Sequence, residues 1–321
     1  MVKAYYSLHF LLTRFVRNCI CIYFWGVSGV TEKKKILVTG GAGFVGSHLC
    51  ERLALDPINK VYSLDNYFTG SENNHVKNVS YIRGNTIDIA NLVHFTPDIV
   101  YHLGEYSRVE QSFDDIETVL RYNTYGTFAV MEFVRKTGCK ILYAGSSTKF
   151  SNGNHGHSSS PYAWTKATNT KLVVNYGKWF NIPYAITYFY NVYGKKEINT
   201  GKYATLIALF IEKMKAGKPL KVVSPGTQMR NFTFIDDIIE GIILVGEYGY
   251  GDEFGIGSDE SFSILEVAKL FGGEIEMLSE RKGNRMSADI LTDKTRALGW
   301  SPKCRLEDYI TAQKANNWNK A

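Results

Sequence analysis

The segment Thr39–Gly46, Thr-Gly-Gly-Ala-Gly-Phe-Val-Gly, constrains the fold of this chain more than any other feature. It follows a short apolar run and opens a stretch of helical character, Val45–Leu55. Gly40 permits a tight turn, Gly43 lets the backbone approach a pyrophosphate, and Gly46 lets helix and strand pack closely. The helix N-terminus offers N–H donors and a partial positive charge. The segment therefore predicts a dinucleotide-binding turn.

A carboxylate ends the next apolar run. Asp65 follows Val61–Leu64 and lies 19 residues after Gly46. A carboxylate at this place can accept hydrogen bonds from both hydroxyls of an adenosine ribose, and it repels a 2′-phosphate. The sequence therefore favours NAD over NADP. The alternative is an incidental glycine-rich turn followed by a surface aspartate.

The chain then alternates strand-like and helical stretches. We expect strands at 35–39, 61–64, 99–103, 141–144 and 184–188, and helices at 45–55, 116–137 and 162–180. Such alternation is typical of a parallel sheet covered by helices on both faces. The predicted fold class is α/β, a Rossmann-type doubly wound parallel sheet with a smaller mixed α/β lobe at its C-terminal end.

Three regions are expected along the 321 residues. Residues 1–32 form an N-terminal extension that no pattern defines, and residues 33–193 form the NAD-binding domain. Residues 194–321 form most of a substrate-binding lobe, although the chain can cross back between the two. Ligands of open α/β sheets bind at the carboxyl edge of the strands, so we expect the lobe to close over that edge.

The basic charge belongs to the extension. The net charge is +6, and the first 35 residues hold six Lys or Arg and one Glu, so the remainder sums to about +1. Nucleic-acid binding is therefore not expected. The longest uncharged run, Asn18–Thr31, is shorter than the roughly 18–20 residues that span a bilayer, so integral insertion is not expected either. Three roles stay open for the N-terminal extension: a dispensable segment, an interfacial or docking helix, or a membrane anchor.

Five cysteines show neither a CxxC pair nor regular spacing. They predict no zinc site and no disulfide framework, and they favour a reducing compartment, the cytoplasm.

A tyrosine and a lysine share one face of the last predicted helix. Tyr162 and Lys166 are spaced i, i+4. A phenol is a poor base at neutral pH, but a nearby ammonium stabilises its phenolate. The pair follows a strand that ends at Ser146 and Ser147, whose hydroxyls can bond a substrate oxygen. These residues predict an acid–base site; the alternative is a half-buried aromatic beside a surface lysine.

These segments resemble the extended short-chain dehydrogenase/reductase superfamily, in its sugar-nucleotide epimerase and dehydratase branch (UDP-glucose 4-epimerase-like). The resemblance covers about residues 34–310. Its motifs, in chain order, are TGGAGFVGSHL (39–49), DNYFTG (65–70), VYHLGEYSRVEQS (100–112), NTYGT (123–127), YAGSST (143–148), SPYAWTK (160–166), YNVYG (190–194), RNFTFIDD (230–237) and ALGWSP (297–302).

The resemblance implies a role for each matched residue. Tyr162 would be the base, Lys166 would hold the nicotinamide ribose and tune Tyr162, and Ser146 or Ser147 would bond the sugar hydroxyl. The implied NAD-binding residues are Gly40, Gly43, Phe44, Val45, Gly46, Asp65, Asn66, Leu103 and Lys166. The implied substrate-binding residues are Asn191 and Arg230 at the diphosphate, Arg281, and Ala288, whose small side chain would admit N-acetylated sugars.

The segment after Ser147 bears on the reaction. The family's dehydratases carry Asp-Glu there and its decarboxylases a Glu, whereas Gly145–Pro161 holds no carboxylate. We therefore expect epimerisation at C4 of a UDP-hexose (glucose/galactose or the N-acetylhexosamine pair) through a 4-keto sugar, by a homodimer like similar enzymes. The alternatives are a 4,6-dehydratase that recruits Glu105 as its acid, a 4-keto-sugar reductase, and a non-catalytic NAD-binding scaffold or sensor.

Glu105 departs from the family pattern, because it replaces a small residue near the expected nicotinamide pocket. A buried carboxylate is costly unless it is paired. Either Arg108 or a substrate group pairs it, or Glu105 points away and is solvated.

Overall fold

A computed structural model describes residues 32–147, 159–280 and 290–318. The predictions for Arg281, Ala288 and residues 1–31 concern positions outside this set. The features below belong to the unit that spans residues 34–321. Nowhere in the described ranges is a helix both long and apolar enough to cross a bilayer.

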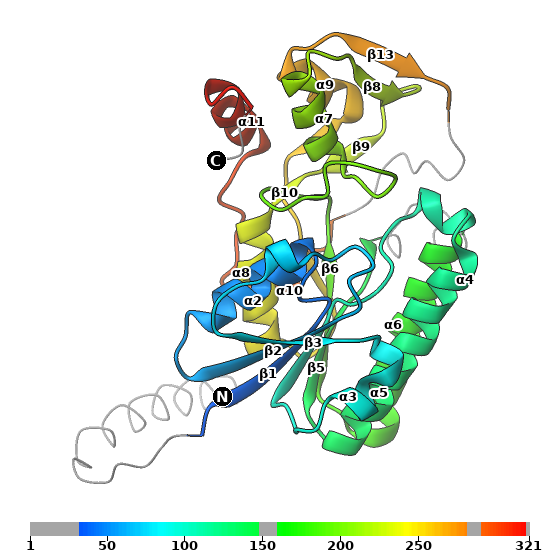
Figure 1. Cartoon of the computed structure of the whole chain (residues 1–321), viewed down its shortest axis with the longest axis vertical. Helices are drawn as coiled ribbons and strands as arrows, with labels where there is room; N and C mark the ends of the chain where they lie inside the picture. The colour runs from blue at the N-terminus through cyan, green and yellow to red at the C-terminus, as the bar shows by residue number, and fades with distance from the viewer. Residues whose placement is uncertain (1–31, 148–158, 281–289, 319–321) are drawn as a thin grey trace, which may run out of the picture. The chain divides into compact units, whose positions relative to one another are not determined.

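A large parallel sheet forms the centre of this unit (Figure 1). Within the described residues it has seven strands, in the order β11-β6-β5-β4-β1-β2-β3, and every pair is parallel. The strands are β1 (Lys34–Thr39), β2 (Asn59–Asp65), β3 (Val79–Arg83), β4 (Ile99–His102), β5 (Lys140–Ala144), β6 (Tyr184–Phe189) and β11 (Gly251–Ile256). The predicted Rossmann-type fold class is confirmed, and β3 and β11 add to the five expected strands.

The strand order reverses at β1. The chain runs outward on one side through β2 and β3, then returns to β4 on the other side of β1. Thr39 and His102 end these two strands and are register partners. Loops that leave adjacent strands in opposite directions open a crevice, and this is where α/β sheets bind ligands.

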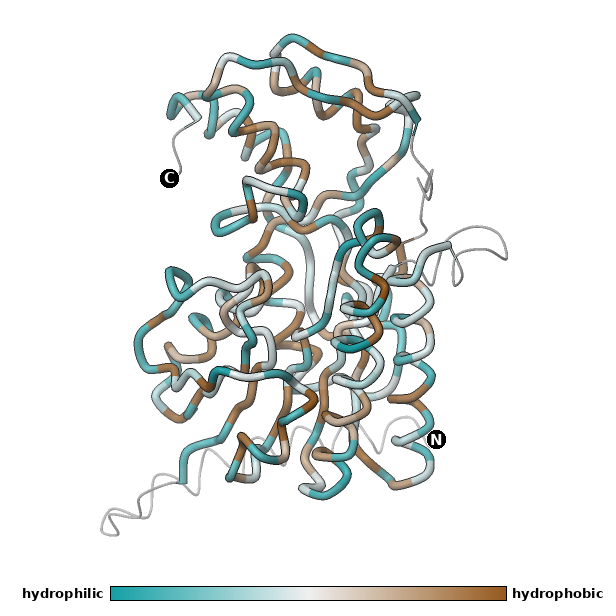
Figure 2. The backbone as a smooth tube through the Cα atoms, turned by 45° about the vertical axis from the view of Figure 1, so that its right-hand side comes forward, coloured by the Kyte–Doolittle hydropathy of each residue, from teal (hydrophilic) through white to brown (hydrophobic). Residues whose placement is uncertain are grey.

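Helices cover both faces of the sheet. On β1, Ile36 and Val38 join one buried cluster with residues of α2 (Phe44–Ala54) and α8 (Ile235–Tyr248), whereas Leu37 joins another with residues of α5 (Gly126–Thr137) and α6 (Pro161–Phe180). This alternation follows from the two-residue period of a strand. The sheet is thus apolar on both faces, and hydrophobic stretches run along its strands (Figure 2).

The helix expected at 116–137 is continuous but not uniform. It comprises α4 (Ile116–Val119), a π-helical segment η4 (Leu120–Tyr125) and α5. Wider π turns are frequent at functional sites. Here the wide turn holds Asn123, which is fully buried. The shorter helices are η1 (Glu72–Asn74), η2 (Thr86–Asp88), α3 (Ile89–Leu92), η3 (Glu110–Phe113) and α10 (Asp293–Ala297).

A smaller mixed α/β lobe has a core of its own. It contains α7 (Leu206–Lys215), α9 (Ile264–Phe271), α11 (Leu306–Ala315) and the parallel pair β8 (Leu220–Val223) with β13 (Ile275–Leu278). Two short pairs complete the fold, β7 (Val192–Tyr193) with β10 (Thr233–Phe234) and β9 (Met229–Asn231) with β12 (Ser261–Ser263). Because α8 and β11 return to the large sheet, the division near residue 194 remains a prediction.

Candidate active site

One cavity of about 670 Å³ lies where the parallel strands end. It brings together every described residue of the three predicted sets, catalytic, NAD-binding and substrate-binding, whose individual roles are proposals. The predicted residues in its lining are Gly40, Gly43, Phe44, Val45, Gly46, Asp65, Asn66, Leu103, Ser146, Ser147, Tyr162, Lys166, Asn191 and Arg230. Its wall also contains charged and aromatic residues to which the sequence assigned no ligand: Phe68, Glu105, Tyr106, Arg108, Tyr122 and Glu197.

The glycine turn leaves very little room for side chains. Gly40 has a φ of +75°, and a Cβ on it would lie 2.9 Å from Cα of Gly104. A Cβ on Gly46 would lie 2.1 Å from the carbonyl oxygen of Gly40. Gly43 is the N-cap of α2 and has no side chain to satisfy the N–H groups of the first turn. These open donors at a positive helix end suit a pyrophosphate.

Asp65 ties two loops together at the end of β2. Its Oδ2 accepts a hydrogen bond from the Ala42 N–H at 2.9 Å, and its Oδ1 accepts one from the Tyr67 N–H at 2.7 Å. Burial raises the pKa of Asp65, and these two backbone donors lower it in part. Each oxygen retains a second lone pair, so the carboxylate can still accept bonds from two ribose hydroxyls.

The start of α6 positions the acid–base pair. Ser160 caps the helix, with Oγ accepting a hydrogen bond from the Ala163 N–H at 3.1 Å, and Pro161 occupies the first turn. Tyr162 and Lys166 follow in the first two turns and both line the cavity. The Lys166 side chain is only 6% exposed.

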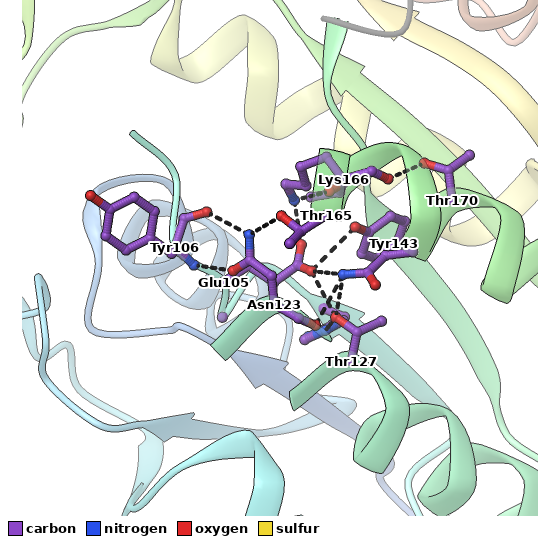
Figure 3. A network of polar contacts seen from close by, with 12 residues as sticks. Glu105, Tyr106, Asn123, Thr127, Tyr143, Thr165, Lys166 and Thr170 are labelled. Carbon is purple, nitrogen blue, oxygen red and sulfur yellow. Dashed lines mark hydrogen bonds and ion pairs between the residues drawn. The ribbon is translucent and has the colours of Figure 1, made fainter. Parts of the chain in front are cut away.

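Lys166 forms a buried ion pair with Glu105, and Figure 3 shows this contact. The interpretation that Glu105 points away and is solvated is wrong, because its side chain is 1% exposed. Glu105 is paired, but by Lys166 in place of the expected Arg108. Burial alone raises the pKa of Glu105. The Lys166 ammonium and the hydrogen bonds to the carboxylate outweigh burial and hold this pKa below its ordinary value.

Three further groups donate hydrogen bonds to Glu105 Oε1. They are Thr127 Oγ1 at 2.7 Å, Asn169 Nδ2 at 2.7 Å and the Tyr143 hydroxyl at 3.2 Å. They come from α5, α6 and β5, and Figure 3 labels Thr127 and Tyr143 beside the carboxylate. A buried carboxylate needs such a set of donors to stay ionised.

A chain of hydrogen bonds links this carboxylate to the glycine turn. Thr127 donates its proton to Glu105, so its oxygen accepts from His102 Nε2–H at 3.0 Å. His102 Nδ1 then accepts from the Thr39 hydroxyl at 2.7 Å, and Thr39 accepts from the Gly104 N–H at 3.0 Å. Burial lowers the pKa of His102 to about 4, which agrees with a neutral ring.

Asn123 holds the loop that carries Glu105. Its Oδ1 accepts from the Tyr106 N–H at 2.7 Å, and its Nδ2 donates to the Tyr106 carbonyl at 3.1 Å. A second bond from Nδ2 reaches Thr165 Oγ1 on α6 at 3.0 Å. The π-helical turn thereby fixes the loop after β4 against the helix that bears Lys166.

Arg108 lies on the same loop and faces the smaller lobe. Its Nε donates to the Tyr203 carbonyl at 2.8 Å, and its Nη1 donates to the Ser107 carbonyl at 3.1 Å. The Tyr203 and Tyr106 hydroxyls both donate to Asp115 Oδ2 at 2.8 Å. Arg108 therefore connects the loop after β4 with the loop that precedes α7.

The predicted diphosphate contacts come from the lobe side. Asn191 follows β6 with a φ of 37°, and its Nδ2 donates to the Asn231 carbonyl at 3.2 Å. Arg230 lies on β9, half-buried, and its Nη1 donates to the Met229 carbonyl at 2.8 Å. Both line the cavity, so an anion there would meet an amide and a guanidinium.

Glu197 is a buried carboxyl that sequence reasoning missed. Its Oε2 accepts from the Gly194 N–H at 2.9 Å, and its Oε1 shares a hydrogen bond with Thr205 Oγ1 at 2.6 Å. Burial raises the pKa of Glu197 to about 7. No motif marks it; its only sequence signal is its position three residues after the YNVYG segment.

A Rossmann-type sheet with a Tyr/Lys pair beside a dinucleotide turn defines a site for chemistry with a nicotinamide cofactor. The model of the NAD dependent epimerase/dehydratase family matches residues 36–257, and the chain belongs to this family. The predictions of the family and of NAD as its cofactor are confirmed.

Named relatives catalyse different reactions. The chain is 28% identical over 300 residues to UDP-glucuronic acid decarboxylase 6 of Arabidopsis thaliana, with 86% of each chain covered. It is 28% identical to a UDP-glucuronic acid 4-epimerase of Bacillus cereus, solved with UDP-glucuronic acid and NAD (TM-score 0.76, 88% and 98% covered). A UDP-glucose 4-epimerase of Thermotoga maritima shares the fold (TM-score 0.79, 24% identity, 86% and 96% covered). The family and these relatives support NAD-dependent modification of a sugar nucleotide.

Proposed function

We propose that this protein epimerises a UDP-hexose at C4 through a transient 4-keto sugar. The observation that carries the proposal is that Tyr162, Lys166, Ser146 and Ser147 line the same cavity as the glycine turn. Bound NAD would supply the acceptor for the C4 hydride, and its reduced form would be the donor that gives the hydride back on the opposite face of the 4-keto sugar. The protein then needs only a base that removes and returns the proton of the C4 hydroxyl, and Tyr162 has that role.

Lys166 can serve both Tyr162 and the cofactor. An ammonium has three N–H donors. One bonds Glu105 and one bonds the Ala144 carbonyl at 2.5 Å, which leaves one for a hydroxyl of the nicotinamide ribose. Either Ser146 or Ser147 bonds the sugar hydroxyl. Gly43, Gly46 and the other residues of the turn hold the pyrophosphate, and Asp65 holds the adenosine ribose.

The state of Glu105 favours epimerisation over elimination. A 4,6-dehydratase must protonate the leaving C6 hydroxyl. Glu105 accepts four hydrogen bonds, and the Lys166 ammonium keeps its pKa low, so it has no proton to donate near neutral pH. The alternative that recruits Glu105 as the acid therefore loses its support.

Glu197 supports a second candidate reaction. It is a cavity-lining carboxyl that is still partly protonated at neutral pH. A general acid needs this property. A 4,6-dehydratase that uses Glu197 as its acid is therefore the competing proposal, and Glu197→Gln would abolish that elimination while leaving 4-epimerisation in place.

We also infer a homodimer. The segment η4–α5 and the start of α6 expose large apolar side chains: Tyr125 is 63%, Phe128 50% and Trp164 47% exposed. Apolar side chains gathered on adjacent helices are typical of a protein–protein interface.

We further propose a cytoplasmic location, because the described cysteines Cys50, Cys139 and Cys304 are free thiols.

The test is turnover of defined substrates by the NAD-loaded protein, with products identified by proton NMR. UDP-glucose, UDP-N-acetylglucosamine and UDP-glucuronic acid are compared, the last because two relatives are named for it. The proposal predicts a C4 epimer without net NADH. Tyr162→Phe should lose at least about 100-fold in rate. Stoichiometric NADH oxidation would indicate a reductase, and NAD binding without turnover of any sugar would favour a scaffold.

A further inference from the structure

Two opposite charges enter the site on one loop. Glu105 and Arg108 both follow β4, and both line the cavity. Glu105 is buried against Lys166. Arg108 instead donates hydrogen bonds to the carbonyls of Tyr203 and Ser107 and to the Ser107 hydroxyl. The loop therefore adds an anion at Lys166 and a cation elsewhere on the same cavity wall.

Pairing weakens the electrostatic effect of Lys166 on its surroundings. An ammonium held against a carboxylate acts on a third group as a dipole, whose field decays faster than that of a single charge. Tyr162 lies one helical turn before Lys166. Its phenolate therefore gains less from Lys166 than it would gain from an unpaired lysine at the same place.

Arg108 is the cation that the loop after β4 adds to the cavity wall. A guanidinium stays charged throughout the physiological pH range. Burial lowers the pKa of Arg108, and Tyr162 provides the largest of the charge interactions that oppose this effect. Arg108 and Tyr162 line the same cavity, and Asn123 ties their two segments together by bonding the Tyr106 backbone on the loop and Thr165 Oγ1 on α6.

We propose that Glu105 and Arg108 together change which residue supplies positive charge to the base Tyr162. Glu105 neutralises Lys166, and Arg108 stabilises the Tyr162 phenolate in its place. Both are positioning residues for the acid–base step. The inference therefore rests on the proposed function, and it adds a device that the Tyr/Lys pair does not contain.

Several titratable groups around this set are uncharged near neutral pH, whereas Asp115 and Lys202 form an ion pair beside Tyr203, and Glu110 and Arg230 also line the cavity. Burial lowers the pKa of His102 on β4 to about 4, and it raises the pKa values of Tyr106, Tyr143 and Tyr203. Glu197, which interacts with Arg108, is partly charged, because its pKa of about 7 lies inside the working range. Each Tyr162 titration is therefore repeated in protein that also carries Glu197→Gln.

The experiment follows the ionisation of Tyr162 directly. The full chain, loaded with NAD, carries tyrosine labelled with ¹³C at the ring carbon bearing the hydroxyl, and Tyr162→Phe identifies the Tyr162 signal. Arg108→Gln should raise the midpoint of the Tyr162 titration by about one pH unit. Arg108→Lys keeps the positive charge, so its midpoint should lie close to that of the unmodified protein. Glu105→Gln should lower the midpoint, because it frees the charge of Lys166. The double variant should return close to the original midpoint.

An unchanged midpoint in Arg108→Gln would overturn the proposal, and so would a rise in Glu105→Gln. If Glu105→Gln does not fold, the two Arg108 variants still decide whether Arg108 stabilises the phenolate. The titration needs no sugar, so failure of this inference can be distinguished from failure of the proposed function. A shifted midpoint without turnover contradicts only the proposed function, whereas turnover with an unshifted midpoint contradicts only this inference.

Discussion

Glu105 accepts a hydrogen bond from Lys166 in the interior of the protein, although 61 positions separate the two residues. Three elements contribute to their surroundings, because β5, α5 and α6 each place a polar group on Glu105. Removing one partner of a buried ion pair leaves a charge without compensation, whereas removing both can be nearly neutral.

Lys166→Met should therefore destabilise the protein by about 3 kcal/mol, and Glu105→Gln/Lys166→Met should recover at least half of this loss. Urea unfolding at pH 7 measures both. The Lys166 ammonium, against the effect of burial, holds the pKa of Glu105 below 4.5 in the folded state. Its contribution to stability is thus present above pH 4.5 and lost as the pH falls below it. Equal losses in the single and double variants would refute the pairing.

The two glycines of the turn should respond differently to alanine. A Cβ at Gly46 would lie 2.1 Å from a backbone oxygen, whereas a Cβ at Gly43 would lie 3.2 Å from the same atom, the Gly40 carbonyl. Gly46→Ala should lower the free energy of unfolding by about 2 kcal/mol. Gly43→Ala should change stability little and weaken NAD binding about tenfold, because its Cβ would face the pyrophosphate. Thermal unfolding and calorimetric titration with NAD separate the two effects, and similar losses of stability would count against this geometry.

The features that could be predicted from the sequence are local ones. The glycine turn, Asp65 and the Tyr162/Lys166 spacing each depend on a few consecutive residues. Strand β3 was missed because its side chains are only half-buried or exposed, so no apolar run marks it. The partner of Glu105 could not be predicted, because the pair depends on how α6 packs against the loop after β4.

The carboxyl of Glu197 should make stability depend on pH. Burial raises its pKa from 4.5 to about 7 in the folded protein, so the folded state binds the proton more tightly than the unfolded state. Stability should then fall as the pH rises from 4.5 to 7, by an amount on the order of 3 kcal/mol. Glu197→Gln should remove this dependence, and Glu212→Gln, on the more exposed side chain of a nearby glutamate, should retain it. Parallel pH dependence in all three proteins, measured by urea unfolding, would contradict the role of burial.

The proposed dimer interface can be tested by introducing a charged side chain into it. Phe128→Glu places a carboxylate on an apolar, 50% exposed position of α5, and it should convert the dimer to a monomer. Tyr248→Glu is the control, since Tyr248 is 60% exposed at the end of α8, away from these helices. Sedimentation velocity distinguishes the two states. A wild-type monomer, or dimers of both variants, would exclude this surface.

The central claim is that the hydrogen at C4 leaves the sugar and returns to the same carbon. The substrate identified among the three compared sugar nucleotides is prepared with deuterium at C4. The NAD-loaded protein converts it, and NMR and mass spectrometry locate the deuterium in the product. We expect the C4 epimer to retain the deuterium at C4, and Tyr162→Phe to form this product at least about 100-fold more slowly. Deuterium at C6 of a 4-keto-6-deoxy sugar, a pentose with release of carbon dioxide, or loss of the label to solvent would contradict the account.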